Sequence, residues 1–220
     1  MDNKDSNYSH GHHHMEFHNP EDVRSNRLAA SAVLNIASAG LQLWGGYSGV
    51  ESVLIVEAAE EFTDGMAFAA AAVEVRTEKK QLSQKARNLA IGFAMGAATI
   101  ATGITATELV AERGSMLQPL EGIDLNNNAY KAAVGALAIN SVVFFLNRNG
   151  NKSDETIDRF AFKDSLKDAA IPATVLGLAA VKAPQYIKSI FEIGAVSYGW
   201  YNTVQLYKGW RGKPQKNNAN

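Results

Sequence analysis

The stretch SVLIVEAAEEFTDGMAFAAAAV, residues 52–73, places four carboxylates inside an otherwise apolar segment. They belong to Glu57, Glu60, Glu61 and Asp64. On an α-helix, which turns by about 100° per residue, these side chains fall within a sector of roughly 100°. The segment has the length of a membrane-spanning helix, about 20 residues. Because an ionised side chain that faces lipid costs about 2.5–3.5 kcal/mol or more, we expect the acidic face to look into a helical bundle.

Six apolar stretches rich in alanine and glycine follow one another along the chain. They cover residues 28–47, 52–75, 88–111, 129–146, 165–187 and 189–207. Their apolar spacing is helical, without the period-two alternation of strands. The sequence therefore predicts an all-α fold, a six-transmembrane-helix bundle over residues 24–210. We expect a polar, disordered tail at 1–23 and a short polar tail at 211–220.

Lysine and arginine are distributed unevenly between the two sides of the membrane that these stretches would separate. With the N-terminus in the cytoplasm, 17 of the 21 basic residues fall on the cytoplasmic side, Lys167 among them. The four on the other side are Arg113, Lys131, Lys182 and Lys188. This is the bias of multi-pass membrane proteins, and it predicts a protein of the cytoplasmic membrane with both termini cytoplasmic. The mean hydropathy of −0.14 favours the alternative, a soluble helical bundle.

Composition excludes several other classes of function. A net charge of −1 provides no basic surface for nucleic acid, and the lack of cysteine excludes disulfides and thiolate metal sites. No nucleophile–base arrangement, phosphate-binding loop or dinucleotide fingerprint is present. We therefore do not expect an enzyme, nor a bound cofactor.

A second acidic pair lies in DSLKD, residues 164–168. Asp164 and Asp168 are four residues apart and share a helix face, as do Glu60 and Asp64. Two such helices can bring four carboxylates to one point. The spacing predicts a metal site formed by Glu60, Asp64, Asp164 and Asp168. The alternatives are a solvated helix face and, for the fifth stretch, hydration at its cytoplasmic beginning.

These motifs, in this order, resemble the cation diffusion facilitator (cation efflux) family over about residues 24 to 210. E-x-x-E-x-x-x-D, with Glu57, Glu60 and Asp64, resembles the D-x-x-[HD]-x-x-x-D motif of the family's second helix. DSLKDAAIPATVLGLAAV resembles the [HD]-x-x-x-D motif of its fifth helix.

Two further segments are similar to the same family and add supporting residues. NRLAASAVLNIASAG contains Asn35 in mid-helix, and ALAINSVVFFLNRN contains Asn140. The resemblance adds Asn35 and Asn140 as supporting residues. Glu57, one turn away on the same helix face, and Glu61 are expected to support the site as well. The resemblance also implies a homodimer that exports a divalent cation from the cytoplasm, usually in exchange for protons.

The sequence departs from the family at several places. TEKKQLSQKARN stands where the family has a histidine-rich loop, and Lys188 stands near the place of an aspartate. The chain ends nine residues after Arg211, so we expect a divergent member without the cytoplasmic C-terminal domain. These departures favour an alternative function, a membrane scaffold that no longer transports.

Carboxylates alone suit hard cations, which favours Mn²⁺ or Fe²⁺ over Zn²⁺, since zinc prefers imidazole and thiolate.

All five histidines lie in the N-terminal tail, outside the predicted core: His10, His12, His13, His14 and His18. The tail fits three interpretations: metal capture, an engineered tag, or a plain disordered terminus.

Overall fold

The structure is a computed structural model that describes residues 20–49, 51–76, 80–120, 122–153 and 156–211. Within these ranges the chain folds into six α-helices and one short 3₁₀ helix, which confirms the all-α prediction. The helices are α1 (Pro20–Gly49), α2 (Ser52–Arg76), α3 (Lys80–Glu112), α4 (Asn128–Asn147), η1 (Arg148–Lys152), α5 (Thr156–Ala180) and α6 (Gln185–Arg211).

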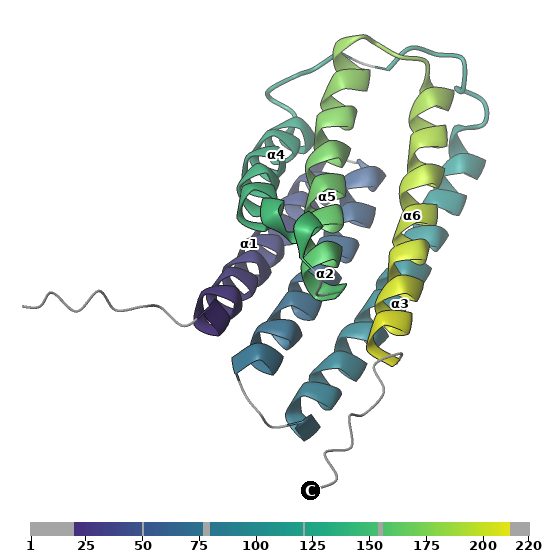
Figure 1. Cartoon of the computed structure of the whole chain (residues 1–220). Helices are drawn as coiled ribbons and strands as arrows, with labels where there is room; N and C mark the ends of the chain where they lie inside the picture. Colours follow the sequence, from purple (N-terminus) through teal and green to yellow (C-terminus); the bar gives the residue numbers. More distant parts are fainter. Residues whose placement is uncertain (1–19, 50, 77–79, 121, 154–155, 212–220) are drawn as a thin grey trace, which may run out of the picture.

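Two groups of helices make up the bundle. α1, α2, α4 and α5 pack together, while α3 and α6 form a pair beside them (Figure 1). α2 is the central helix, since it packs extensively against both α1 and α3. α6 packs mainly on α3 and touches α2 and α5 only slightly. Side chains between α2, α5 and α6 therefore lie where the helices pack least tightly against one another.

The boundary between the fifth and sixth helices differs from the prediction. The fifth apolar stretch was expected to run to Ile187, but α5 ends at Ala180 and α6 begins at Gln185. Lys182 adopts a left-handed conformation with φ 50°, which closes a helix C-terminus. Pro184 follows, and a proline cannot continue the helix because it lacks the amide hydrogen.

The N-terminal boundary also lies earlier than expected. α1 begins at Pro20, within the tail that we expected to end at residue 23. Proline is favoured in a first helical turn, and Glu21 and Asp22 complement the positive end of the helix dipole there. The predicted tail residues 1–19 and 212–220 lie outside the described residues.

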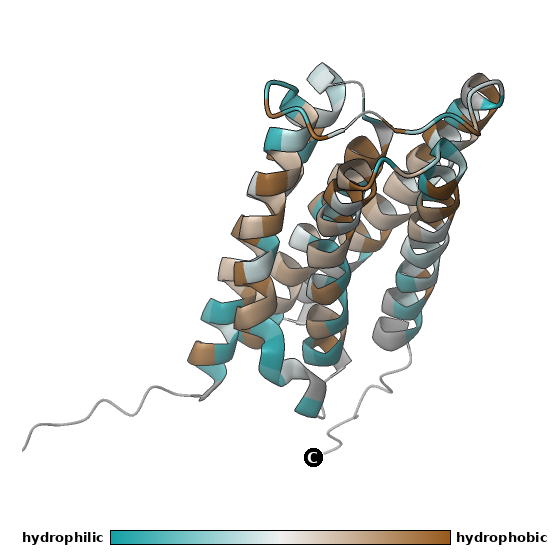
Figure 2. Ribbon diagram, turned by 90° about the horizontal axis from the view of Figure 1, so that it is seen from above, coloured by the Kyte–Doolittle hydropathy of each residue, from teal (hydrophilic) through white to brown (hydrophobic). Residues whose placement is uncertain are grey.

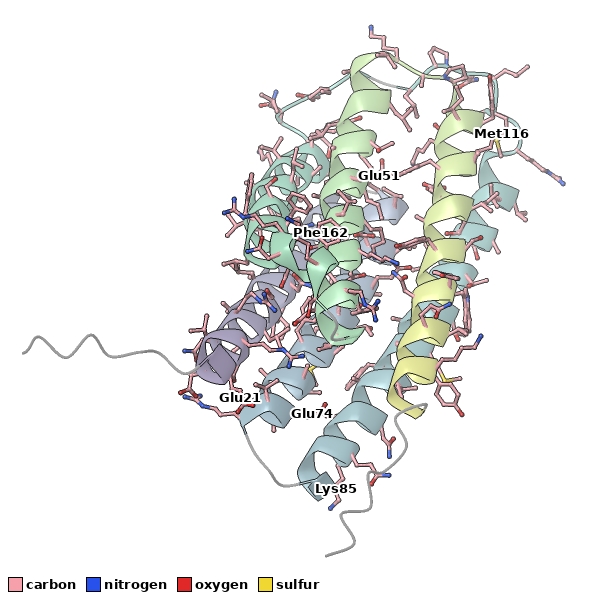
Figure 3. All side chains as sticks on the ribbon, in the orientation of Figure 1. Glu21, Glu51, Glu74, Lys85, Met116 and Phe162 are labelled. Carbon is pink, nitrogen blue, oxygen red and sulfur yellow. The ribbon has the colours of Figure 1, made fainter. Side chains whose placement is uncertain are left out.

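The α3–α4 and α5–α6 connections meet at one end of the bundle. The amide of Leu120 donates to the carbonyl of Ala183 at 2.8 Å, and the amide of Gln185 donates to the carbonyl of Gln118 at 2.9 Å. The beginning of α1 and the end of α6 lie at the opposite end (Figure 1). In Figure 3, Glu21, Glu74 and Lys85 lie toward the lower end of the bundle, and Met116 lies toward the upper end. The up-and-down order that the basic residues predict is thus the order of the helices.

Glycines permit the close approach of α1 to its neighbours. A Cβ at Gly45 would overlap the Cβ of Ala132 on α4 and lie 2.9 Å from the carbonyl oxygen of Asn128. A Cβ at Gly65 of α2 would lie 3.0 Å from the carbonyl oxygen of Ala32. Small residues at such crossings are typical of helices that associate in membranes, where tight packing replaces the hydrophobic effect.

The bundle buries many polar side chains beside its hydrophobic core and exposes many large apolar ones. Among the described residues, 28 large hydrophobic side chains are exposed, and Val33, Phe145 and Ile190 are each more than 60% exposed. Glu61 and Asn140, in contrast, are fully buried. Figure 2 shows hydrophobic positions along the helices and hydrophilic ones gathered mainly toward their ends. This pattern is the reverse of that of water-soluble proteins, which seldom bury carboxylates or expose extended apolar surface.

In the part of the chain that the structure describes, three helical segments are long and apolar enough to cross a membrane: Glu21–Gly49, Asn88–Ala111 and Asn128–Gly150. At most 44% of the residues in their most apolar windows are buried within the bundle, so their apolar side chains face outward. α2, α5 and α6 contain the carboxylates and lysines that the bundle encloses. The described residues therefore form a six-helix bundle with three candidate membrane spans.

Candidate metal centre

The acidic face of α2 points into the bundle. Glu57, Glu60, Glu61 and Asp64 are all buried, and no more than 7% of any of them is exposed. Their burial follows from their spacing on the most enclosed helix of the bundle. Since buried carboxylates are costly without partners, the groups that surround them decide what this face can do.

Asp64 of α2 meets Asp164 and Asp168 of α5. One carboxylate oxygen from each residue lies within 4.8 Å of the other two, and all three residues are buried. Two oxygens bound to one hard cation at about 2.0–2.6 Å are separated by no more than about 4–5 Å. The three aspartates can therefore hold one metal ion. They are three of the four ligands that the i, i+4 spacing predicts.

An ammonium group lies at the centre of these carboxylates. Nζ of Lys167 is 2.8 Å from Oε2 of Glu60 and 3.1 Å from Oδ1 of Asp168. It also lies 3.8 Å from Oδ1 of Asp164 and 3.9 Å from Oδ2 of Asp64. The side chain is only 10% exposed.

One expectation is wrong at this point. The sequence predicts Lys167 on the cytoplasmic side, but it is an interior residue that neutralises part of the acidic centre. Glu60 lies outside the group of three aspartates and forms an ion pair with Lys167, so its role as a fourth ligand stays a prediction.

Glu61 is held by the helices on the other side of α2. Its Oε1 accepts a hydrogen bond from Nε2 of Gln42 on α1 and another from Nδ2 of Asn140 on α4. The same amide of Asn140 donates to the carbonyl oxygen of Asp168 at 2.8 Å. Asn140 thus joins α2 to α5 next to a predicted ligand, which fits its expected supporting role. Gln42 was not anticipated.

Glu57 and Asn35 are buried without hydrogen-bond partners. Neither oxygen of Glu57 accepts a hydrogen bond in the described part of the chain, although the residue is 1% exposed. Glu57 lies within electrostatic reach of Lys167 and Asp168, so it adds an unpartnered carboxylate to the centre. Asn35 is buried in α1, and neither atom of its amide has a partner, so no described contact links it to the centre.

A small cavity of about 20 Å³ adjoins the centre between α2, α3, α5 and α6. Glu60, Asp64 and Lys167 line one side, and Gly199, Asn202 and Thr203 of α6 line another. Such a volume holds about one water molecule. Nδ2 of Asn202 donates to Oδ1 of Asp164 at 3.4 Å, as expected of a polar residue between helices. A Cβ at Gly199 would overlap a carboxylate oxygen of Glu60, so a larger residue there would require the Glu60 side chain to shift.

A second group of charges, buried or partly buried, surrounds Lys188 near the end where α3–α4 and α5–α6 connect. Nζ of Lys188 is 2.7 Å from Oε1 of Glu51, 3.6 Å from Oε1 of Glu108 and 3.5 Å from Oε1 of Glu192. Figure 3 labels Glu51 in the upper part of the bundle, below the level of Met116. The group links the α1–α2 junction to α3 and α6. Spacing in the sequence indicated none of these contacts except the i, i+4 pair on α6.

Comparison with known proteins adds no assignment, because neither the protein-family models nor the curated proteins include one that matches this chain. The tail histidines His10, His12, His13, His14 and His18 lie outside the described residues, so metal capture there stays a prediction. The assignment of function rests on the geometry of the centre and on the membrane-like surface.

Proposed function

We propose that this chain is a multi-pass protein of the cytoplasmic membrane that binds a divalent cation at Asp64, Asp164 and Asp168 and exports it. One observation carries the proposal: three buried aspartates from two helices converge inside a bundle whose outer surface is apolar. Glu57 adds a fourth buried carboxylate that lacks a hydrogen-bond donor. Buried negative charge in a membrane protein typically lies on an ion pathway.

The donor chemistry favours Mn²⁺ or Fe²⁺ as the cargo. All candidate ligands are carboxylates, which suit hard cations better than they suit Zn²⁺. Several carboxylates this close together cannot all be ionised cheaply, so entry of a dication should release protons. Proton exchange and homodimer formation, which the resemblance to the cation diffusion facilitator family implies, are part of the same proposal.

Reconstitution into proteoliposomes tests the transport function. We expect Mn²⁺ or Fe²⁺ to accumulate in vesicles with an acidic lumen, faster than in protein-free vesicles, and collapse of the proton gradient should slow the uptake. Zn²⁺ should be taken up more slowly. Mn²⁺, Fe²⁺ and Zn²⁺ fluxes no greater than those of protein-free vesicles would contradict export.

Cysteine labelling tests the membrane arrangement, because the chain has no cysteine of its own. Gln84→Cys, exposed on α3, should react with an impermeant reagent only after intact cells are permeabilised. Leu117→Cys, 85% exposed in the α3–α4 connection, should react without permeabilisation. The reverse pattern would invert the topology. Recovery of the protein in the aqueous fraction without detergent would support a soluble bundle instead.

A second candidate function is a non-transporting membrane scaffold. The position of Lys167 favours it, since an ammonium at the centre of the carboxylates can make the acidic group a purely structural ion-pair network. In that case the purified protein would bind no divalent cation, and neutralising the aspartates would change its stability but no flux.

A further inference from the structure

Lys167 occupies the place where a cation would bind. Its Nζ lies within 4.0 Å of a carboxylate oxygen from each of Glu60, Asp64, Asp164 and Asp168. These residues come from two helices, and they are the four positions that the sequence predicts as ligands. A lysine that forms a simple ion pair contacts one carboxylate, whereas Lys167 contacts four. The ammonium is surrounded as a bound cation would be.

A divalent ion and this ammonium exclude each other. An ion that contacts Asp64, Asp164 and Asp168 would lie within a few ångströms of Nζ, where two positive charges in a poorly hydrated interior repel strongly. The flexible stem of lysine allows its ammonium to move while the helix stays in place. Lys167 lines the cavity together with Gly199 and Thr203 of α6, so the ammonium can move from the carboxylates toward this cavity.

We propose that Lys167 is a tethered cation that competes with the cargo, so that a metal ion binds the three aspartates only by displacing the ammonium toward the α6 cavity. This inference rests on the proposed function. It adds a basis for selectivity, because a covalently attached ammonium has a high effective concentration at the site. A monovalent ion gains little by replacing another single charge, whereas a divalent ion gains an additional charge interaction with the aspartates. Lys167 therefore excludes Na⁺ and K⁺ and weakens the binding of the divalent cargo enough to permit its release.

The test compares the purified full chain with Lys167→Met and with the double variant Lys167→Met/Glu60→Gln. The double variant removes one positive and one negative charge, so it keeps the formal charge of the original centre and leaves the three aspartates intact. Lys163→Met, an exposed position one turn earlier on α5, is the matched control. Binding of Mn²⁺ and of Na⁺ is measured by calorimetry and by the metal-induced shift of the melting temperature.

Both Lys167 variants are expected to bind Mn²⁺ at least about tenfold more tightly than the original chain, and to gain stabilisation by Na⁺ that the original chain lacks. Lys163→Met should bind as the original does. Should Lys167→Met fail to fold without metal, the double variant provides the comparison at constant charge. Mn²⁺ binding that is unchanged or weaker in the folded variants would overturn this inference alone. Absence of Mn²⁺ binding in every protein, the original included, would overturn the proposed function as well.

Discussion

The double variant Asp64→Asn/Asp168→Asn is expected to bind Mn²⁺ at least about 100-fold more weakly than the original chain, a loss of roughly 2.8 kcal/mol. Each substitution keeps the shape of the side chain and removes the charge that holds the ion. The folded state should persist. The metal-free protein should melt at the same temperature or higher, because two mutually repelling carboxylates are gone from a buried cluster. Titration calorimetry and circular dichroism in detergent measure both effects.

Asp124→Asn serves as the control for this pair, since Asp124 is an exposed carboxylate in the α3–α4 connection. Its Mn²⁺ affinity should equal that of the original chain. Glu57→Gln removes the unpartnered carboxylate beside the aspartates and should weaken binding by a smaller factor. Undiminished Mn²⁺ affinity in Asp64→Asn/Asp168→Asn would show that the metal does not bind between α2 and α5, and would favour the scaffold function.

Lys188→Met should destabilise the bundle by about 3 kcal/mol, the lower end of the cost of breaking a buried ion pair. The substitution would leave the carboxylates of Glu51, Glu108 and Glu192 close together without their shared ammonium. These residues join the α1–α2 junction to α3 and α6, so α6 should separate first at this end. A thermal melt in detergent measures the stability, and hydrogen exchange along α6 locates the loss.

Two comparisons make the Lys188 prediction specific. Lys85→Met removes an exposed ammonium from α3 and should leave the melting temperature unchanged. Lys188→Met/Glu192→Gln removes one charge of each sign and should recover part of the lost stability. Equal melting temperatures for Lys188→Met and the original chain would show that the Lys188 ion pairs contribute nothing to holding α6.

Helical periodicity was sufficient to predict the architecture and the core of the site. Carboxylates four residues apart must share a helix face, and an acidic face inside apolar helices must turn inward. These two rules predict that Asp64, Asp164 and Asp168 turn inward, and the packing of the helices then brings them together. The alternation of basic segments likewise predicted the order of the helices along the bundle.

The interior position of Lys167 does not follow from the distribution of basic residues. That distribution predicts a loop position for each lysine near the end of an apolar stretch. Lys167, however, follows Asp164 by three residues, a spacing that places the two on neighbouring positions of one helix face. A lysine on the face of two predicted ligands was the signal that could have identified it as an interior residue.

The surroundings of Lys188 and the α5–α6 boundary needed information that periodicity does not contain. Glu51 and Glu108 lie far from Lys188 in the sequence, and only the register of the packed helices brings them to its ammonium. At the boundary, the apolar run continues to Ile187, while the chain conformation at Lys182 and Pro184 ends the helix. Residues that interrupt a helix, such as Pro184, therefore predict where it ends better than hydrophobicity does.

Anomalous scattering from crystals of the protein soaked in Mn²⁺ shows whether one divalent cation binds between α2 and α5. We expect one strong peak about 2.0–2.6 Å from oxygens of Asp64, Asp164 and Asp168, with the Lys167 ammonium moved toward Gly199 and Thr203 of α6. A map without a peak at this position, in which Nζ of Lys167 still lies among the four carboxylates at saturating Mn²⁺, would contradict metal binding between α2 and α5.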